Sequence, residues 1–153
     1  MPHKVNSYYF SRLKLFFDYS FSILILFAIL PLLVIIAFSI LVTAGRPIIF
    51  VQKRMGKDGK SFSIYKFRTM CKGAHKQQSK LHNLNQAPGP MFKIFDDPRF
   101  VGVGKILSGT GLDELPQVFN ILKGEMSFVG PRPLPVAEAK KLSSAWDFRK
   151  LVK

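Results

Sequence analysis

The chain has 153 residues, 48% of them hydrophobic, so it is the size of one domain and too apolar to be disordered. Lys and Arg number 23 against nine Asp and Glu, which gives a formal net charge of +14 at pH 7. The single cysteine, Cys71, excludes an internal disulfide framework and agrees with a reducing compartment. A secreted domain held together by disulfides is therefore excluded.

An uncharged apolar run covers residues 19–44. It exceeds the roughly 18 residues that identify a membrane helix, so the sequence predicts membrane insertion rather than a buried core helix. Pro31 lies near its middle, removes a backbone donor and predicts a kink or break. Each half is about 18–20 Å long, which is too short to cross a hydrocarbon core of about 30 Å alone.

Basic residues flank this run on both sides, and the positive-inside tendency places both flanks in the cytoplasm. A helix–break–helix hairpin that enters and leaves through one leaflet satisfies both the flanking charge and the central proline. A kinked single span is the alternative, and the residues alone leave the two topologies level. We expect residues 1–45 to form a basic segment and the membrane-embedded part, and residues 46–153 to form a cytoplasmic domain.

The middle of the chain, residues 46–80, carries ten Lys and Arg and one acid, Asp58. β-Branched and aromatic residues on either side of the Gly-rich turn at 56–59 predict a short β-hairpin, with strands near 48–51 and 62–67. The charge fits a solvated face, a nucleic-acid patch or a phosphate-rich substrate site beside a membrane. Because no DNA- or RNA-binding motif accompanies the cations, no nucleic acid is expected as a partner.

Two adjacent acids, Asp113 and Glu114, are the most informative feature of the last third of the chain. Apolar residues recur at helical spacing over residues 112–122, and Gly124 predicts the end of that helix. The acids then fall at or just before the helix N-terminus, where the helix dipole favours an ionised carboxylate. Asp113 by itself is compatible with a simple N-cap, whereas an acid pair in so basic a chain suits a divalent cation or a nucleophile beside one.

Two arginine-containing turns accompany the acids. Arg132 lies between two prolines that restrict its backbone, so its guanidinium is suited to bidentate phosphate recognition. Asp97-Pro98-Arg99 is a second acidic turn followed by an arginine. Each turn is a weak signal by itself.

Together, these features resemble the bacterial sugar transferase family, the monotopic polyprenyl-phosphate phosphoglycosyl transferases. The resemblance rests on the apolar run with its central proline and on five blocks that occur in the family's order. The blocks are residues 50–56, 65–70, 97–99, 112–117 and 123–133. The match covers nearly everything from Arg12 onward, and the last two blocks are highly specific.

The resemblance implies a membrane-associated α+β fold with a re-entrant hairpin, a short β-hairpin and surface helices that carry the catalytic site. It implies transfer of a sugar-1-phosphate from a UDP-sugar to a polyprenyl phosphate with release of UMP, a step that initiates exopolysaccharide or glycoconjugate synthesis. The implied partners are a UDP-sugar, polyprenyl phosphate and membrane lipids, and the implied cofactor is Mg²⁺. The implied location is the cytoplasmic face of the bacterial inner membrane.

The same resemblance assigns roles to individual residues. Asp113 would be the nucleophile that attacks the β-phosphate to form a covalent phosphosugar intermediate, and it would also hold Mg²⁺. Glu114 would be the second catalytic acid. Four cations would bind the substrate phosphates: Lys66, Arg68, Arg99 and Arg132.

The chain also departs from the family pattern. Ser108 stands where the family has arginine, Gly111 where it has serine, and Leu30 where a serine often precedes the proline. The family also normally continues beyond the point at which this chain ends. The alternative expectation is therefore a C-terminally truncated, catalytically inactive member that acts as a membrane-anchored binding or scaffold protein.

Overall fold

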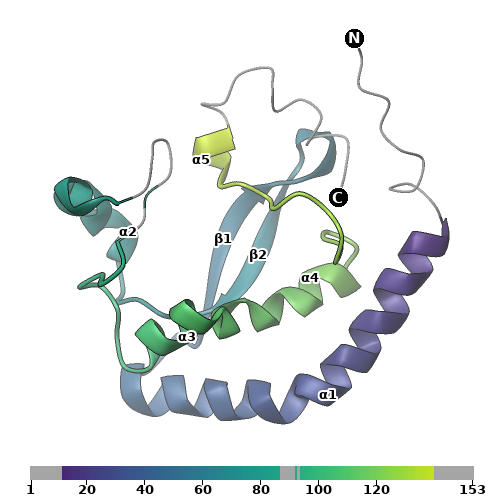
Figure 1. Ribbon diagram of the computed structural model, residues 1–153, viewed down its shortest axis with the longest axis horizontal. Helices are drawn as coiled ribbons and strands as arrows, with labels where there is room; N and C mark the ends of the chain where they lie inside the picture. The colour runs from purple at the N-terminus through teal and green to yellow at the C-terminus, as the bar shows by residue number, and fades with distance from the viewer. Residues whose placement is uncertain (1–11, 87–91, 93, 140–153) are drawn as a thin grey trace.

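The structure, a computed structural model, describes residues 12–86, 92 and 94–139. A long helix, α1 (Arg12–Ala44), passes beneath a two-stranded antiparallel sheet and a group of short helices (Figure 1). Among the described residues, the elements after α1, with 3₁₀ helices labelled η, are β1 (Ile49–Met55), η2 (Lys57–Gly59), β2 (Ser61–Phe67), α2 (Ala74–Gln77), η3 (Gln78–Leu84), α3 (Gly104–Thr110), η4 (Leu112–Gln117), α4 (Val118–Leu122) and α5 (Val136–Ala139). This mixture of helices and antiparallel strands agrees with the expected α+β class.

Helix α1 is continuous through Pro31 and changes direction near its middle, so of the kink or break predicted at Pro31 the structure shows a bend within one helix (Figure 1). It is long and apolar enough to cross a membrane, and only 17% of its most apolar window is buried. Phe27, for example, is 75% exposed. A core helix of a soluble protein would bury such side chains, so their exposure is compatible with contact with lipid. The re-entrant topology stays a prediction.

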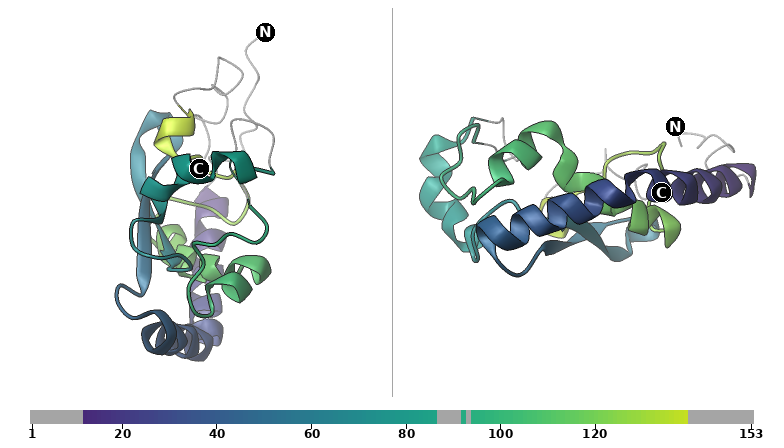
Figure 2. Two further views of the ribbon diagram at one scale, coloured as in Figure 1. Left: turned by 90° about the vertical axis from the view of Figure 1, so that its left-hand side faces the viewer. Right: turned by 90° about the horizontal axis from the view of Figure 1, so that it is seen from below.

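The apolar core joins the second half of α1 to the rest of the chain. Leu33, Ile36 and Ile40 recur at helical spacing and are buried against Phe67 of β2 and Leu107 of α3. Burial of each such side chain contributes about 1.5–3 kcal/mol. Seen from below, α1 extends along the sheet and the short helices (Figure 2). The core therefore fixes the sheet and α3 on the inner side of the bent helix.

The predicted β-hairpin is confirmed. β1 and β2 pair antiparallel, in a register that runs from Ile49 opposite Phe67 to Met55 opposite Ser61. The turn between them passes through η2, where Gly59 adopts a φ of 71°. This left-handed conformation favours glycine, which accounts for the glycine at that position in the turn.

Asn120 of α4 occupies the free edge of β2. Its side-chain amide is fully buried, accepts a hydrogen bond from the N–H of Tyr65 (3.0 Å) and donates one to the carbonyl of Ser63 (2.7 Å). It also donates to Glu125 Oε2 at 2.7 Å. Asn120 therefore satisfies backbone groups that a third strand would otherwise pair, and it fixes α4 against β2.

The helix predicted over residues 112–122 forms in two parts, the 3₁₀ helix η4 and then α4. Pro116 lacks the N–H that an α-helix would direct to the carbonyl four residues earlier, which favours the tighter turn before it. Gly124 follows α4 with a φ of 71°, as expected for a glycine that ends a helix. Asp113 is not the N-cap: Gly111 takes that position, and no side chain caps η4. The Asp113 carboxylate is thus available for other contacts.

Candidate active site

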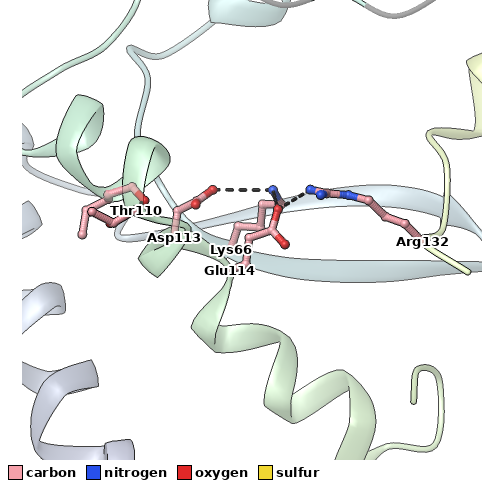
Figure 3. Close-up of polar contacts among 6 residues, drawn as sticks. Lys66, Thr110, Asp113, Glu114 and Arg132 are labelled. Carbon is pink, nitrogen blue, oxygen red and sulfur yellow. Dashed lines mark hydrogen bonds and ion pairs between the residues drawn. The ribbon is translucent and has the colours of Figure 1, made fainter. Parts of the chain in front are cut away.

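An acid pair and two cations, supplied by different elements, form one cluster in which Lys66 reaches both acids and Arg132 reaches Glu114 (Figure 3). η4 supplies Asp113 and Glu114, β2 supplies Lys66, and the segment between α4 and α5 supplies Arg132. Lys66 Nζ lies 2.7 Å from Glu114 Oε1 and 3.5 Å from Asp113 Oδ2. The Arg132 guanidinium donates to the same Glu114 oxygen. Lys66 therefore contacts both carboxylates, and Glu114 is shared by two cations.

The side chains of this cluster differ in exposure, and that of Lys66 is 17% exposed. The Asp113 side chain is 11% exposed, that of Glu114 is 33% exposed and that of Arg132 is 68% exposed. Charges are screened less where water is excluded, so the charges of this cluster are screened least at the Asp113 end and most at Arg132. A ligand that arrives from solvent would meet Arg132 and Glu114 first and Asp113 last.

The two acids have pKa values shifted in opposite directions. Burial raises the pKa of Asp113 above its ordinary value of 3.8, and the charge of Glu114 adds to this rise, whereas Lys66 opposes it. Burial also acts to raise the pKa of Glu114, but the hydrogen bond and charge of Lys66, together with the charge of Arg132, outweigh it and lower that pKa. Asp113 is thus the more basic of the two carboxylates, which suits a nucleophile, while Glu114 holds its charge firmly.

The structure brings two of the four predicted phosphate-binding cations to the acid pair and places the other two elsewhere. Arg68 donates to the carbonyls of Ala44 and Gly45 (2.8 Å to the latter), at the end of α1, where helix carbonyls lack partners and a cation is favoured. Arg99 binds Asp97 through two N–H groups at 2.6 and 2.8 Å, and both side chains are buried. These contacts give Arg68 and Arg99 structural roles, and their phosphate binding stays a prediction.

Two residues that hold the cluster together were not singled out in the sequence. Asn120 fixes β2, the strand that carries Lys66, against α4. Ser127 accepts a hydrogen bond from Lys14 of α1 and so attaches the segment that leads to Arg132. An asparagine among the apolar residues of a predicted helix is a pattern that could have identified Asn120. No local pattern reveals a contact between residues as distant in the chain as Ser127 and Lys14.

Two of the departures from the family pattern lie just before the acid pair. Ser108 is exposed on α3. Gly111 joins α3 to η4 with a φ of 76°. A residue with a side chain would be strained in this left-handed conformation, so glycine suits the turn that delivers Asp113.

The acid pair fits a divalent cation only with help from a substrate. Mg²⁺ prefers oxygen ligands and is commonly bound by one or two carboxylates together with substrate phosphates. Within the described parts of the chain, no group of three or more His, Cys, Asp and Glu could hold a metal ion. Asp113 and Glu114 supply carboxylate oxygens, those of Asp113 largely buried and those of Glu114 partly exposed, that could be shared with a diphosphate.

Comparison with known proteins decides the family. The sequence pattern of the family described as "Bacterial sugar transferase" matches residues 9–153. The chain belongs to the bacterial sugar transferase family. This match confirms the resemblance that the sequence motifs carry.

Three relatives illustrate how far the similarity extends. The chain is 48% identical over 100 residues to the galactosyl transferase CpsE of Streptococcus agalactiae serotype III, a match to 65% of this chain and 22% of the relative. It is 37% identical over 149 residues to the undecaprenyl-phosphate galactose phosphotransferase of Salmonella typhimurium (92% and 30%). It is also 37% identical over 136 residues to the exopolysaccharide production protein ExoY of Sinorhizobium fredii (86% and 60%). The matched regions thus span between 22% and 60% of the lengths of these relatives.

Proposed function

We propose that this sugar transferase transfers a sugar-1-phosphate from a UDP-sugar to a polyprenyl phosphate and releases UMP, at the cytoplasmic face of the bacterial inner membrane. The observation that carries the proposal is the acid pair in contact with two cations, Lys66 with both acids and Arg132 with Glu114. Names of relatives support it: the Salmonella protein is an undecaprenyl-phosphate galactose phosphotransferase, and a 40% identical protein of Klebsiella pneumoniae is a UDP-glucose:undecaprenyl-phosphate glucose-1-phosphate transferase. These names share the lipid phosphate and differ in the sugar, so we propose a class of donor rather than one sugar.

In the first step, a carboxylate oxygen of Asp113 attacks the β-phosphorus, which bears the sugar. A P–O bond to Asp113 forms, the bond from this phosphorus to the oxygen that bridges to the α-phosphate breaks, and UMP leaves with the electron pair. The raised pKa of Asp113 favours the attack. Lys66 and Arg132 neutralise charge on the phosphate oxygens as the bond changes proceed. The product is a mixed anhydride of Asp113 and the sugar phosphate.

In the second step, an oxygen of the polyprenyl phosphate attacks the same phosphorus. The P–O bond to Asp113 breaks, the carboxylate is regenerated, and the product is a polyprenyl diphosphate sugar. Glu114, held by Lys66 and Arg132, keeps both cations beside the reacting phosphorus between the two steps. Mg²⁺ would be held by Asp113 together with the substrate diphosphate, where it would neutralise phosphate charge. The exposed apolar side chains of α1 suit a site that takes its acceptor from the bilayer.

We favour this enzyme over an inactive membrane-anchored scaffold. A scaffold does not need a largely buried carboxylate of raised pKa beside a lysine, and perturbed acids of this kind concentrate at catalytic sites. It also does not need a second acid, Glu114, that forms ion pairs with two cations. The assembled cluster is the feature that distinguishes the two alternatives.

The test is exchange of labelled UMP into the UDP-sugar pool, with the purified chain in detergent or lipid and without any acceptor. A covalent intermediate makes the first half-reaction reversible and complete by itself, so exchange is expected before polyprenyl phosphate is added. Direct transfer to the lipid predicts no exchange without acceptor. Absence of both this exchange and acceptor-dependent UMP release would refute the proposal.

Lys66→Met is expected to move the rise of activity to higher pH. Lys66 lowers the pKa of Asp113, so its removal leaves burial and the Glu114 charge unopposed, and the pKa rises. Because the ionised carboxylate is the nucleophile, activity increases as pH rises through this pKa. We also expect kcat to fall by about 10²–10³-fold, as for loss of one preorganised donor to a developing charge.

The measurement for Lys66 is the pH profile of kcat/KM for the variant and the unmodified chain. Lys105→Met is the matched control, because Lys105 forms an exposed ion pair with Asp96. The control should keep both the rate and the position of the acid limb. An acid limb at the same pH in Lys66→Met and the unmodified chain would contradict the assignment of Lys66.

A further inference from the structure

Arg132 depends on its backbone for its position. It lies in the segment between α4 and α5, and its side chain is 68% exposed with its ion pair to Glu114 at the tip. A long, exposed side chain loses rotamer entropy when it is held in one place, so one surface contact fixes it weakly. The contacts that hold the backbone of this segment therefore determine where the guanidinium lies.

β1 holds the side of the segment that follows Arg132. The N–H of Met55 donates to the carbonyl of Leu134 at 2.9 Å. The guanidinium of Arg54 donates to the carbonyl of Pro133 at 3.1 Å. The fixed φ of proline on either side of Arg132 limits the backbone further.

α1 holds the side that precedes Arg132, through Ser127. Lys14 Nζ donates to Ser127 Oγ and lies 3.0 Å from Asp18 Oδ2. The same hydroxyl accepts a hydrogen bond from the N–H of Val129 at 3.2 Å and donates to the Val129 carbonyl at 3.3 Å. A hydroxyl has one proton and two lone pairs, so these contacts use the full bonding capacity of Ser127.

The N-terminal half of α1 buries polar side chains on the face that meets this segment. Lys14 and Asp18 are both buried and paired with each other, one helical turn apart. Charged side chains are seldom buried unless they are paired, and removal of one partner is strongly destabilising. One turn further on, the ring of Phe21 packs edge-on against that of Phe128, with 5.5 Å between centroids. This face of α1 therefore binds residues 127–128 by both polar and aromatic contacts.

We propose that Lys14 and Ser127 are positioning residues for Arg132. They fix the segment on α1, and β1 fixes its other end, so that the guanidinium between the two attachments meets Glu114 and the phosphates of the donor. This role rests on the proposed function. It makes the first half of α1 a support of the active site as well as part of the membrane-associated helix.

The activity test is a double-mutant cycle between Ser127→Ala and Arg132→Gln in the full chain. We expect Ser127→Ala alone to lower kcat/KM by about 10-fold, because a displaced catalytic group loses much of its effect. In the Arg132→Gln background the same change should have almost no further effect, because Ser127 acts through the guanidinium. Ser127→Thr keeps the hydroxyl and should keep the activity. An undiminished effect of Ser127→Ala in the Arg132→Gln background would overturn the proposal.

Backbone hydrogen exchange gives a readout that does not depend on catalysis. Ser127→Ala and Lys14→Met should each accelerate exchange over residues 127–132 and leave β1 and β2 unchanged. Ser108→Ala, a matched change of an exposed serine on α3, should leave both regions unchanged. Unaltered exchange over 127–132 in both variants would overturn the proposal even in an active enzyme. Accelerated exchange in a chain that has no transferase activity would support the attachment and count against the proposed function alone.

Discussion

Asp113→Asn is expected to abolish the covalent sugar-phosphate adduct and to lower turnover by more than about 10³-fold. The amide has nearly the same size as the carboxylate but no anionic oxygen to attack phosphorus. Because burial raises the pKa of Asp113, the charged carboxylate is less favourable in the folded chain than in the unfolded chain, and its ionisation at neutral pH lowers the stability of the fold. A neutral side chain there removes a poorly solvated charge, so we expect the melting temperature to stay the same or rise while activity is lost.

Intact-mass measurement after incubation with UDP-sugar, without acceptor, checks this expectation. The unmodified chain should gain the mass of one sugar phosphate and Asp113→Asn should gain none. Asp96→Asn is the matched control, since it makes the same change of charge at an exposed side chain paired with Lys105. The control should form the adduct as the unmodified chain does. An adduct on Asp113→Asn would exclude Asp113 as the nucleophile and direct attention to Glu114.

Features that depend on neighbouring residues were predictable from the sequence. The apolar run gives α1, the alternation around a Gly-rich turn gives the β-hairpin, and Gly124 ends the helix after the acid pair. In each case the structure depends on residues only a few positions apart, so the order of apolar, polar and glycine residues in the sequence is enough to predict it. The acid pair at residues 113–114 was noticed because adjacent acids in so basic a chain are not readily explained as a helix cap, and the family resemblance then identified two cations, Lys66 and Arg132, that the structure brings to it.

Features that depend on residues distant in the chain were not predictable in the same way. A Lys or Arg side chain can bind a phosphate, a carboxylate or the carbonyls at a helix end, and the sequence alone does not show which of these partners it binds. Arg68 donates to carbonyls at the C-terminal end of α1 and Arg99 binds Asp97, contacts that the sequence did not predict, and their phosphate binding stays a prediction. The need for glycine at position 104 is likewise set by a distant segment.

Gly104→Ala is expected to destabilise the fold by about 3 kcal/mol, the largest loss of stability that we predict for any substitution. A Cβ at this position would lie 2.0 Å from the carbonyl oxygen of Thr69 and 2.7 Å from its carbonyl carbon. Both are backbone atoms that no rotamer change can move, and the same oxygen accepts a hydrogen bond from the N–H of Val101 at 3.1 Å. Helix α3 must therefore shift, and because it leads directly into η4, the shift should reach Asp113 and lower activity.

The midpoint of thermal unfolding of the detergent-solubilised chain should fall by about 10 °C in Gly104→Ala, given roughly 2–4 °C per kcal/mol for a domain of this size. Gly109→Ala is the matched control: it lies in the same helix, and a Cβ there would meet nothing within 4 Å. Because alanine is the better helix former by about 1 kcal/mol, the control should be as stable as the unmodified chain or slightly more stable. The two substitutions add the same methyl group to one helix, so their difference isolates the contact with Thr69. Equal stability of the two variants would mean that α3 is not held against Thr69, and the placement of η4 and its acid pair would then need another cause.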